Sequence, residues 1–216
     1  MNNSERGSPS EALLNSLLEH YQNGRFNDAE KLALKITQDF PKHQFSWKVL
    51  GVLLEARGRK TEAVEANKTA VELSPQDAEA HNNLGNTLKE LGKLKAAEAS
   101  YNQAIALMPN YAEAHCNLGI TLHGLGSFDK SEASYNQAIA LKPELAEAHS
   151  NLGITQQELG RLKEAEASYN QAIALMPDYA EAHCNLGNVL KELGRLGEAE
   201  ISFNQAIALM PNFAEA

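Results

Sequence analysis

The sequence predicts an all-α protein, a right-handed α-solenoid of six helix-turn-helix units, and three features carry this prediction. The first is a repeat: the segment 99–119 returns at 167–187 with one change, Asn110 to Asp178, and a third version lies at 133–153, so the period is 34 residues. The other two are prolines and glycines that recur with the same period. Proline ends a helix and glycine supplies a tight turn, so each unit reads as helix A, a glycine turn, helix B and a proline turn.

Aligning the chain with itself gives the boundaries of the units. They span 10–43, 44–77, 78–111, 112–145, 146–179 and 180–213. The prolines are Pro41, Pro75, Pro109, Pro143, Pro177 and Pro211, and the turn glycines are Gly24, Gly58, Gly92, Gly126, Gly160 and Gly194. Residues 1–9 are predicted to form a flexible tail, disordered over 1–7, and 214–216 begin a truncated seventh unit.

The third unit shows how each helix is recognised. Apolar and small residues recur every three or four positions, which predicts helix A over about 78–91 and helix B over about 94–107. The large side chains of these stripes fill the space between units, so Leu118, Tyr135, Leu152 and Tyr169 are expected to be buried. The first unit departs from the pattern, because Ser16 and Leu17 replace the Leu-Gly pair of later units.

Polar residues before the helices predict their starts. Ser8-Pro9-Ser10-Glu11 reads as a capping box with Ser8 as N-cap and proline in the first helical position. The same logic applies to three later pairs: Asn110 with Glu113, Asp178 with Glu181, and Asn212 with Glu215. An additional glycine, Gly124, predicts that helix A of the fourth unit ends early.

Together these residues resemble the tetratricopeptide repeat (TPR) family over 10–213. The family pattern places a Trp or similar residue, Leu-Gly, Leu or an aromatic, the turn Gly, two small residues and Pro at fixed positions. The second unit matches it with Trp47, Leu50, Gly51, Leu54, Gly58, Ala63, Ala70 and Pro75. The resemblance implies an array that binds proteins or peptides.

Composition and charge narrow the function. The net charge is −9, which argues against a nucleic-acid partner because phosphate binding needs clustered Lys and Arg. No apolar run approaches the roughly 20 residues that span a bilayer, and the first residues lack the apolar segment of a secretory signal, so no membrane insertion and a cytoplasmic location are expected. Cys116 and Cys184 stand two units apart, about 20 Å, so free thiols are favoured over a disulfide.

The sequence shows no catalytic constellation, so this chain is predicted not to be an enzyme and to need no cofactor. Four histidines share one register: His81, His115, His149 and His183. One per unit places neighbours about 10 Å apart, too far for one zinc ion with ligands at about 2 Å. These histidines are interpreted as packing residues rather than metal ligands, and no metal site is predicted.

A row of asparagines is the main candidate site. Asn83, Asn117, Asn151 and Asn185 share one register of helix A, on a face predicted to line a concave groove. Side-chain amides both donate and accept hydrogen bonds, so such a row can bind the main chain of an extended peptide. The predicted groove comprises Asn83, Asn117, Asn151, Asn185, Asn82, Asn86, Asn188, Glu79, Glu113, Glu147 and Glu181. The competing interpretation is that the asparagines are a by-product of repeat duplication.

The asparagine row also resembles the TPR superhelix of O-linked N-acetylglucosamine transferases and related bacterial TPR proteins. That resemblance implies an alternative function, the N-terminal substrate-recruiting segment of a larger glycosyltransferase-like enzyme. The glutamates would repel a C-terminal carboxylate, which argues against the co-chaperone type of TPR site and favours a neutral or basic partner.

The last unit predicts a second kind of contact. Its helix B carries an apolar stripe made by Leu196, Ala199, Phe203, Ala206 and Ile207. A solenoid exposes such a stripe unless another unit covers it, so self-association through 196–216 is expected.

Overall fold

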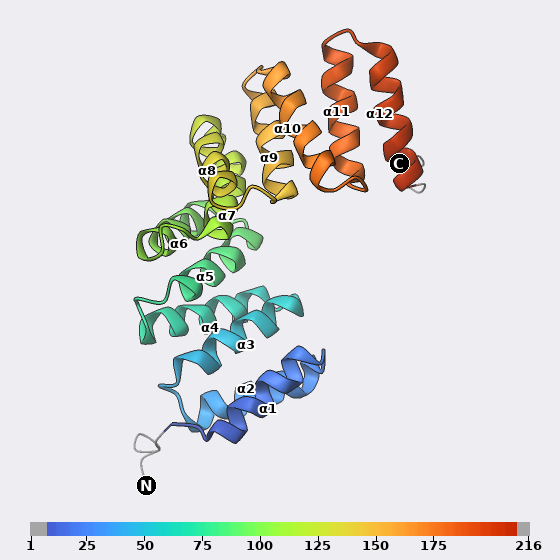
Figure 1. Ribbon diagram of the computed structural model, residues 1–216. Helices are drawn as coiled ribbons and strands as arrows, with labels where there is room; N and C mark the ends of the chain where they lie inside the picture. Colours follow the sequence, from blue (N-terminus) through green and yellow to red (C-terminus); the bar gives the residue numbers. More distant parts are fainter. Residues whose placement is uncertain (1–7, 211–216) are drawn as a thin grey trace. The chain divides into compact units, whose positions relative to one another are not determined.

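The computed structural model describes residues 8–210, and within this range the chain is helical and contains no strand (Figure 1). It divides into two compact halves, residues 1–109 and 110–216. The first half contains α1 (Glu11–Gln22), α2 (Phe26–Asp39), α3 (Gln44–Ala56), α4 (Lys60–Leu73), α5 (Ala78–Glu90) and α6 (Leu94–Leu107). The second contains α7 (Ala112–Gly124), α8 (Phe128–Leu141), α9 (Ala146–Glu158), α10 (Leu162–Leu175), α11 (Ala180–Glu192) and α12 (Leu196–Leu209).

The predicted all-α architecture is confirmed. Within each half every odd-numbered helix packs on the even-numbered helix that follows it, and the pair packs on the next odd-numbered helix. The helices expected near 78–91 and 94–107 are α5 and α6. Between helices A and B the turn glycine has positive φ, 70° at Gly126, a conformation that side chains other than glycine rarely adopt.

Each helix pair of the C-terminal half is joined by a close contact between a glycine and an aromatic ring. A Cβ atom at Gly119 would lie 2.6 Å from a ring carbon of Tyr135, so only glycine lets the ring approach helix A. Tyr135 is 2% exposed and Tyr169 is fully buried. Leu118 and Leu152 are buried as well, so the predicted core positions are confirmed.

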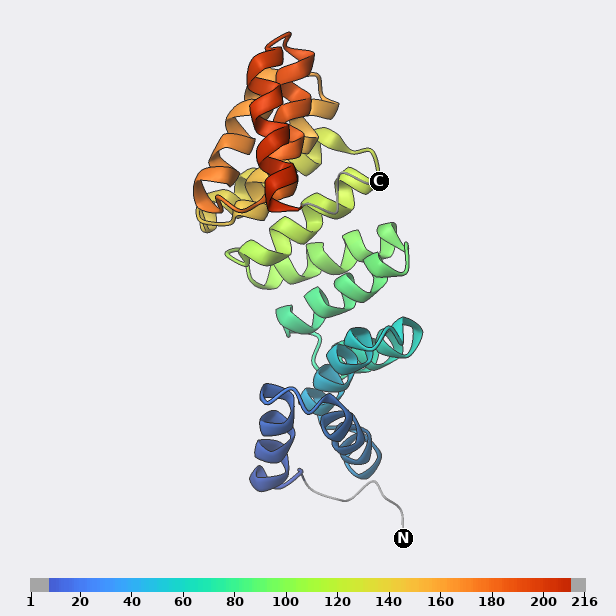
Figure 2. The same cartoon turned by 90° about the vertical axis from the view of Figure 1, so that its right-hand side faces the viewer.

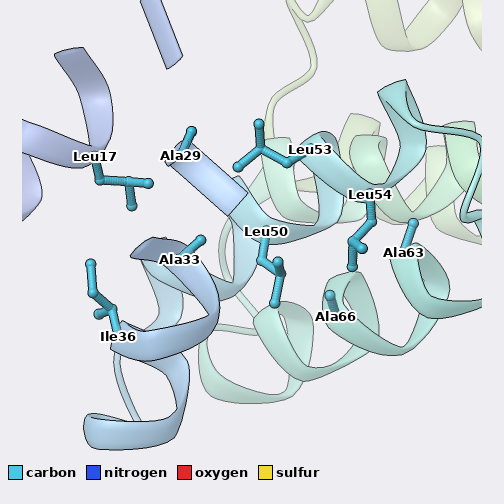
Figure 3. Close-up of a cluster of buried hydrophobic side chains, with 9 residues drawn as sticks. All are labelled: Leu17, Ala29, Ala33, Ile36, Leu50, Leu53, Leu54, Ala63 and Ala66. Atoms are coloured by element: carbon cyan, nitrogen blue, oxygen red, sulfur yellow. The ribbon is translucent and has the colours of Figure 1, made fainter. Parts of the chain in front are cut away.

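The first helix pair reverses this arrangement of large and small residues. Leu17 of α1 takes the glycine register and is fully buried, while Ala33 of α2 takes the tyrosine register (Figure 3). Figure 3 shows both in one apolar cluster with residues of α3 and α4. The helices α1 and α2 pack less closely than the other pairs, because a leucine on helix A holds the two backbones apart.

Three predictions about helix ends are wrong. The N-cap of α1 is Ser10, whose hydroxyl accepts a hydrogen bond from the Leu13 N–H at 3.3 Å, so Ser8 lies outside the helix. Asn110 and Asp178 do not cap either, because α7 and α11 begin one residue later, after Tyr111 and Tyr179.

The fourth unit also differs from expectation. Its helix α7 has 13 residues, as α5, α9 and α11 have, so Gly124 does not shorten it. The expectations for 1–7, for the Asn212–Glu215 cap and for a seventh unit at 214–216 lie outside the described residues.

Candidate functional site: the helix-A face

The odd-numbered helices form a continuous face in the C-terminal half, and α3 and α5 form one in the N-terminal half. In the C-terminal half α7 contacts α9 and α9 contacts α11, and in the N-terminal half α3 contacts α5. Over residues 8–210 no two even-numbered helices of one half make a comparable contact. From α3 to α5 and from α7 to α11 the A helices therefore lie closer together than the B helices, so these parts of the two halves curve toward their helix-A faces.

The four asparagines of the predicted row are all half-buried. Three belong to the C-terminal half: Asn117 on α7, Asn151 on α9 and Asn185 on α11. The backbone carbonyls of Asn117 and Asn151 accept hydrogen bonds from buried threonine hydroxyls at 2.8 and 3.0 Å. Asn83 lies on α5 in the other half. The C-terminal half thus places one asparagine amide on each of three successive A helices.

Two other predicted groove residues have different surroundings from those expected. Asn82 is only 1% exposed, so its predicted place on an open groove is wrong. In later units its register is occupied by Cys116 and Ser150, which are buried, and by Cys184, which is half-buried. Asn86 is half-buried and accepts a hydrogen bond from the Tyr101 hydroxyl at 2.7 Å. Asn188 is exposed.

The glutamates of the helix-A face differ between the two halves. Glu79 accepts a hydrogen bond from the Lys48 ammonium at 2.6 Å. Glu113, Glu147 and Glu181 are exposed, and the described part of the chain supplies no ion-pair partner for them. The acidic character of this face is therefore neutralised near α5 and retained along α7, α9 and α11.

Lys48 is the centre of a polar cluster that joins α3 to the start of α5. Its ammonium also lies 3.1 Å from a carboxylate oxygen of Asp77, which accepts a hydrogen bond from Gln44 at 2.8 Å. Burial disfavours the charged ammonium, but the carboxylates of Glu79 and Asp77 outweigh it and raise the pKa of Lys48. Burial likewise opposes ionisation of Asp77, yet the Ala80 N–H and Lys48 lower its pKa.

The histidine register has a structural role. The Nε2 atoms of His81, His149 and His183 each lie 3.0 Å from the carbonyl of a preceding proline. Trp47 donates its ring N–H to the Pro41 carbonyl at 2.9 Å in the same way. Histidine thus replaces the tryptophan N–H as a donor to the turn. Among residues 8–210 no group of three or more His, Cys, Asp or Glu could hold a metal ion.

Sequence reasoning missed two features that recur along the chain. Thr87, Thr121 and Thr155 are fully buried on the A helices. Ion pairs also link successive units: Arg161 binds Glu132 at 2.6 Å, Arg195 binds Glu166 at 2.7 Å, and Arg59 binds Glu30. The threonines recur every 34 residues, and Arg59, Arg161 and Arg195 share one register of the repeat, so both signals were present in the sequence.

The predicted apolar stripe of the last helix is partly uncovered. Leu196 is 66% exposed and Ile207 is 45% exposed, whereas Ala199 is buried. Both cysteines are free thiols, as expected. None of the helices in 8–210 has the length and hydropathy needed to cross a membrane.

Comparison with known proteins identifies the repeat. The family model described as TPR repeat matches residues 53–92, 85–126, 122–160 and 157–194, and the model described as tetratricopeptide repeat matches 180–213. A search of curated proteins finds no match.

Solved structures share the fold at low sequence identity. The type IV pilus biogenesis factor PilW superposes with a TM-score of 0.85 at 22% identity over 94% of this chain and 96% of that one. PilF of Pseudomonas aeruginosa gives 0.81 at 17% identity, over 94% and 92% of the two chains. YrrB, described as a TPR protein with an unusual peptide-binding site, gives 0.68 at 20% identity, over 83% and 93%.

Proposed function

The chain belongs to the tetratricopeptide repeat family, and we propose that it is a protein-interaction scaffold that binds an extended peptide segment of a partner on its helix-A face. The observation that carries the proposal is the recurrence of one half-buried asparagine on each of α7, α9 and α11. Their side-chain amides offer donors and acceptors at a constant spacing, which suits the repeating N–H and C=O groups of a peptide backbone. Recognition of this kind depends little on the sequence of the peptide.

Charge narrows the class of partner. Glu113, Glu147 and Glu181 are exposed on the same three helices, and no ion pair with another described residue neutralises them. An acidic face raises the local concentration of cations and disfavours anions. The proposed partner is therefore a neutral or basic extended segment, bound along the C-terminal half.

A double substitution tests the asparagine row. A linear peptide that binds the parent chain is first selected from a random peptide library, and its dissociation constant is then measured for Asn117→Ala plus Asn151→Ala. Losing two hydrogen bonds of about 0.5–1.5 kcal/mol each should weaken binding about 5- to 150-fold. The melting temperature should stay nearly unchanged, because neither amide belongs to the buried core.

The matched control makes the same change on the B helices. Asn136 and Asn170 are exposed asparagines of α8 and α10, two residues of the same repeats. Asn136→Ala plus Asn170→Ala should leave the dissociation constant unchanged. Equal binding by the parent and the Asn117→Ala plus Asn151→Ala variant would overturn the proposal.

A further inference from the structure

The last helix pair carries a hollow that the proposed peptide face does not explain. It lies between α11 and α12, with a volume of about 470 Å³. Its residues are Ala180, Glu181, Cys184, Asn185, Phe203, Ala206, Ile207 and Met210. Most of this lining is apolar, and Ile207 and Met210 are 45% and 38% exposed. In Figure 2 the red helix α12 lies at the front of the C-terminal half.

The same surface occurs earlier in this half, where it is covered. In the fourth unit, Cys116, Tyr135 and Ala138 correspond to Cys184, Phe203 and Ala206 of the hollow. They pack against Ala148 and Leu152 of α9 and against Leu145 just before it. Helix α11 covers the next copy of this surface, where Tyr169 and Ile173 pack with Leu186. The hollow is thus a third copy of an interface that the chain uses twice internally.

The covering helices define the chemistry of the occupant. Each carries an apolar residue just before its start, an alanine three residues later and a leucine four residues after that. The sets are Leu145, Ala148 and Leu152 for α9, and Tyr179, Ala182 and Leu186 for α11. This spacing puts the three side chains on one face of a helix, and the alanine allows a close approach of the two backbones.

Burial shows what the covering helix contributes. Tyr135 is 2% exposed and Tyr169 is fully buried, whereas Phe203 at the same register is only half-buried. The difference arises because Tyr135 and Tyr169 lie under a following A helix. This apolar surface is buried in two copies and open in the third. Covering the third copy with a similar helix should therefore lower the free energy.

We propose that the hollow between α11 and α12 is a docking site for an amphipathic helix with this apolar-x-x-Ala-x-x-x-Leu pattern. The ligand is a helix, and it contacts side chains of both α11 and α12. The site shares Glu181 and Asn185 with the helix-A face proposed for an extended peptide, but its occupant is a helix that also lies against Phe203, Ala206 and Ile207 of α12. The contact repeats, between two molecules, the packing of α9 on α7 and α8.

A peptide from this chain serves as the probe. A fluorescein-labelled peptide of residues 177–193, which contains the whole of α11, is titrated into the full chain and followed by fluorescence anisotropy. Saturable binding with one peptide per chain is expected. The same peptide with Leu186→Asp should bind at least ten times more weakly, because the leucine is the buried end of its apolar face.

A pair of variants in the protein separates the hollow from the rest of α12. Ile207→Asp places a charge in the hollow and should weaken peptide binding at least tenfold. Ile201→Asp is the matched control: Ile201 is 70% exposed on the same helix and does not line the hollow. It should bind the peptide as the parent does. Asn117→Ala plus Asn151→Ala should also leave this binding unchanged, so the two proposals fail independently.

Four results would overturn the proposal. One is no binding at several hundred micromolar protein, and another is equal binding by the parent and Ile207→Asp. A third is a dimer in light scattering that Ile207→Asp disrupts but the peptide does not. In that case the occupant of the hollow is a second copy of the chain. A fourth is binding that occurs only after Phe213→Asp, because the chain's own end then occupies the hollow.

Discussion

The two halves of the chain use the same repeat registers in different ways. In the C-terminal half the pairs Gly119 with Tyr135 and Gly153 with Tyr169 are near copies of each other. In the N-terminal half the third unit has the same kind of pair, Gly85 with Tyr101, but the registers hold Leu17 with Ala33 in the first unit and Gly51 with Asn67 in the second. Leu17 with Ala33 has about the same combined volume as Gly with Tyr, whereas Gly51 with Asn67 is smaller, so the registers fix neither the residues nor their total volume.

The difference extends to the outward surfaces at the two ends of the array. Ser16 and His20 of α1 occupy registers that hold Leu118 and Leu122 in α7, and they line a shallow hollow together with Asp28, Lys31 and Lys35. The hollow between α11 and α12 instead keeps the apolar residues of an internal interface. Near-exact duplication keeps the last helix pair's surface apolar, whereas substitutions at a few registers make the surface of the first helix pair polar.

The largest difference between the halves is expected at the tyrosine register. Tyr169→Ala should lower the free energy of unfolding by about 3–5 kcal/mol, because it empties a fully buried site. Asn67→Ala at the same register should cost about 1 kcal/mol or less. Asn67 donates hydrogen bonds to the Thr87 hydroxyl at 2.9 Å and to the Asn83 carbonyl at 3.4 Å, but its buried side-chain oxygen has no partner, so removing the amide also removes a cost.

Urea denaturation followed by circular dichroism measures both values. Asn170→Ala, next to Tyr169 but exposed, is the control and should change stability by less than about 0.5 kcal/mol. A loss below about 1 kcal/mol for Tyr169→Ala would show that its ring does not anchor the interface between units.

How much of the fold and of the candidate site could be predicted from the sequence depends on whether the interactions lie within one helix or between helices. The helices, the glycine turns and the buried tyrosines follow from local periodicity, and the sequence predicted them. The burial of Asn82 did not follow, because the periodicity of one helix does not show where the neighbouring A helix lies. Three helix starts were missed by one or two residues, because side chains such as Asn110 and Asp178 look like caps yet precede the N-cap by one position. The asparagine row stays a prediction.

Alanine at the glycine register should destabilise both halves for opposite reasons. Leu17→Ala leaves a cavity in the first helix pair and should cost about 2–5 kcal/mol. Gly153→Ala places a Cβ atom 2.8 Å from a ring carbon of Tyr169 and should cost about 1–3 kcal/mol by overpacking. Hydrogen exchange of α1 and α9 amides locates each effect in its own half.

A third glycine provides the control for this comparison. Gly197 lies within α12, and a Cβ atom there would meet no other atom within 4 Å. Gly197→Ala should therefore stabilise the helix by about 0.5–1 kcal/mol, since alanine has the higher helix propensity. If Gly153→Ala were equally stabilising, the contact between Gly153 and the ring of Tyr169 would not limit how closely helices α9 and α10 pack.

The smallest predicted difference concerns the starts of A helices. Asp77 accepts a hydrogen bond from the Ala80 N–H at 3.1 Å and so caps α5, whereas Tyr179 at the same register gives α11 no side-chain cap. Asp77→Ala should cost about 0.5–2 kcal/mol at neutral pH. Asp178→Ala, beside Tyr179, is the control and should cost almost nothing.

The cost of losing Asp77 should also depend on pH. Burial opposes ionisation of this carboxyl, but the Ala80 N–H and the Lys48 ammonium outweigh it, so its pKa in the folded chain lies below the ordinary 3.8. A carboxyl with a lowered pKa stabilises the fold above its unfolded pKa and loses that contribution as the pH falls through the folded value. The stability difference between the parent and Asp77→Asn should therefore be full at pH 6 and shrink below about pH 4. An equal difference at pH 6 and pH 3 would mean that the charge of Asp77 does not contribute and that its oxygen acts only as a neutral acceptor.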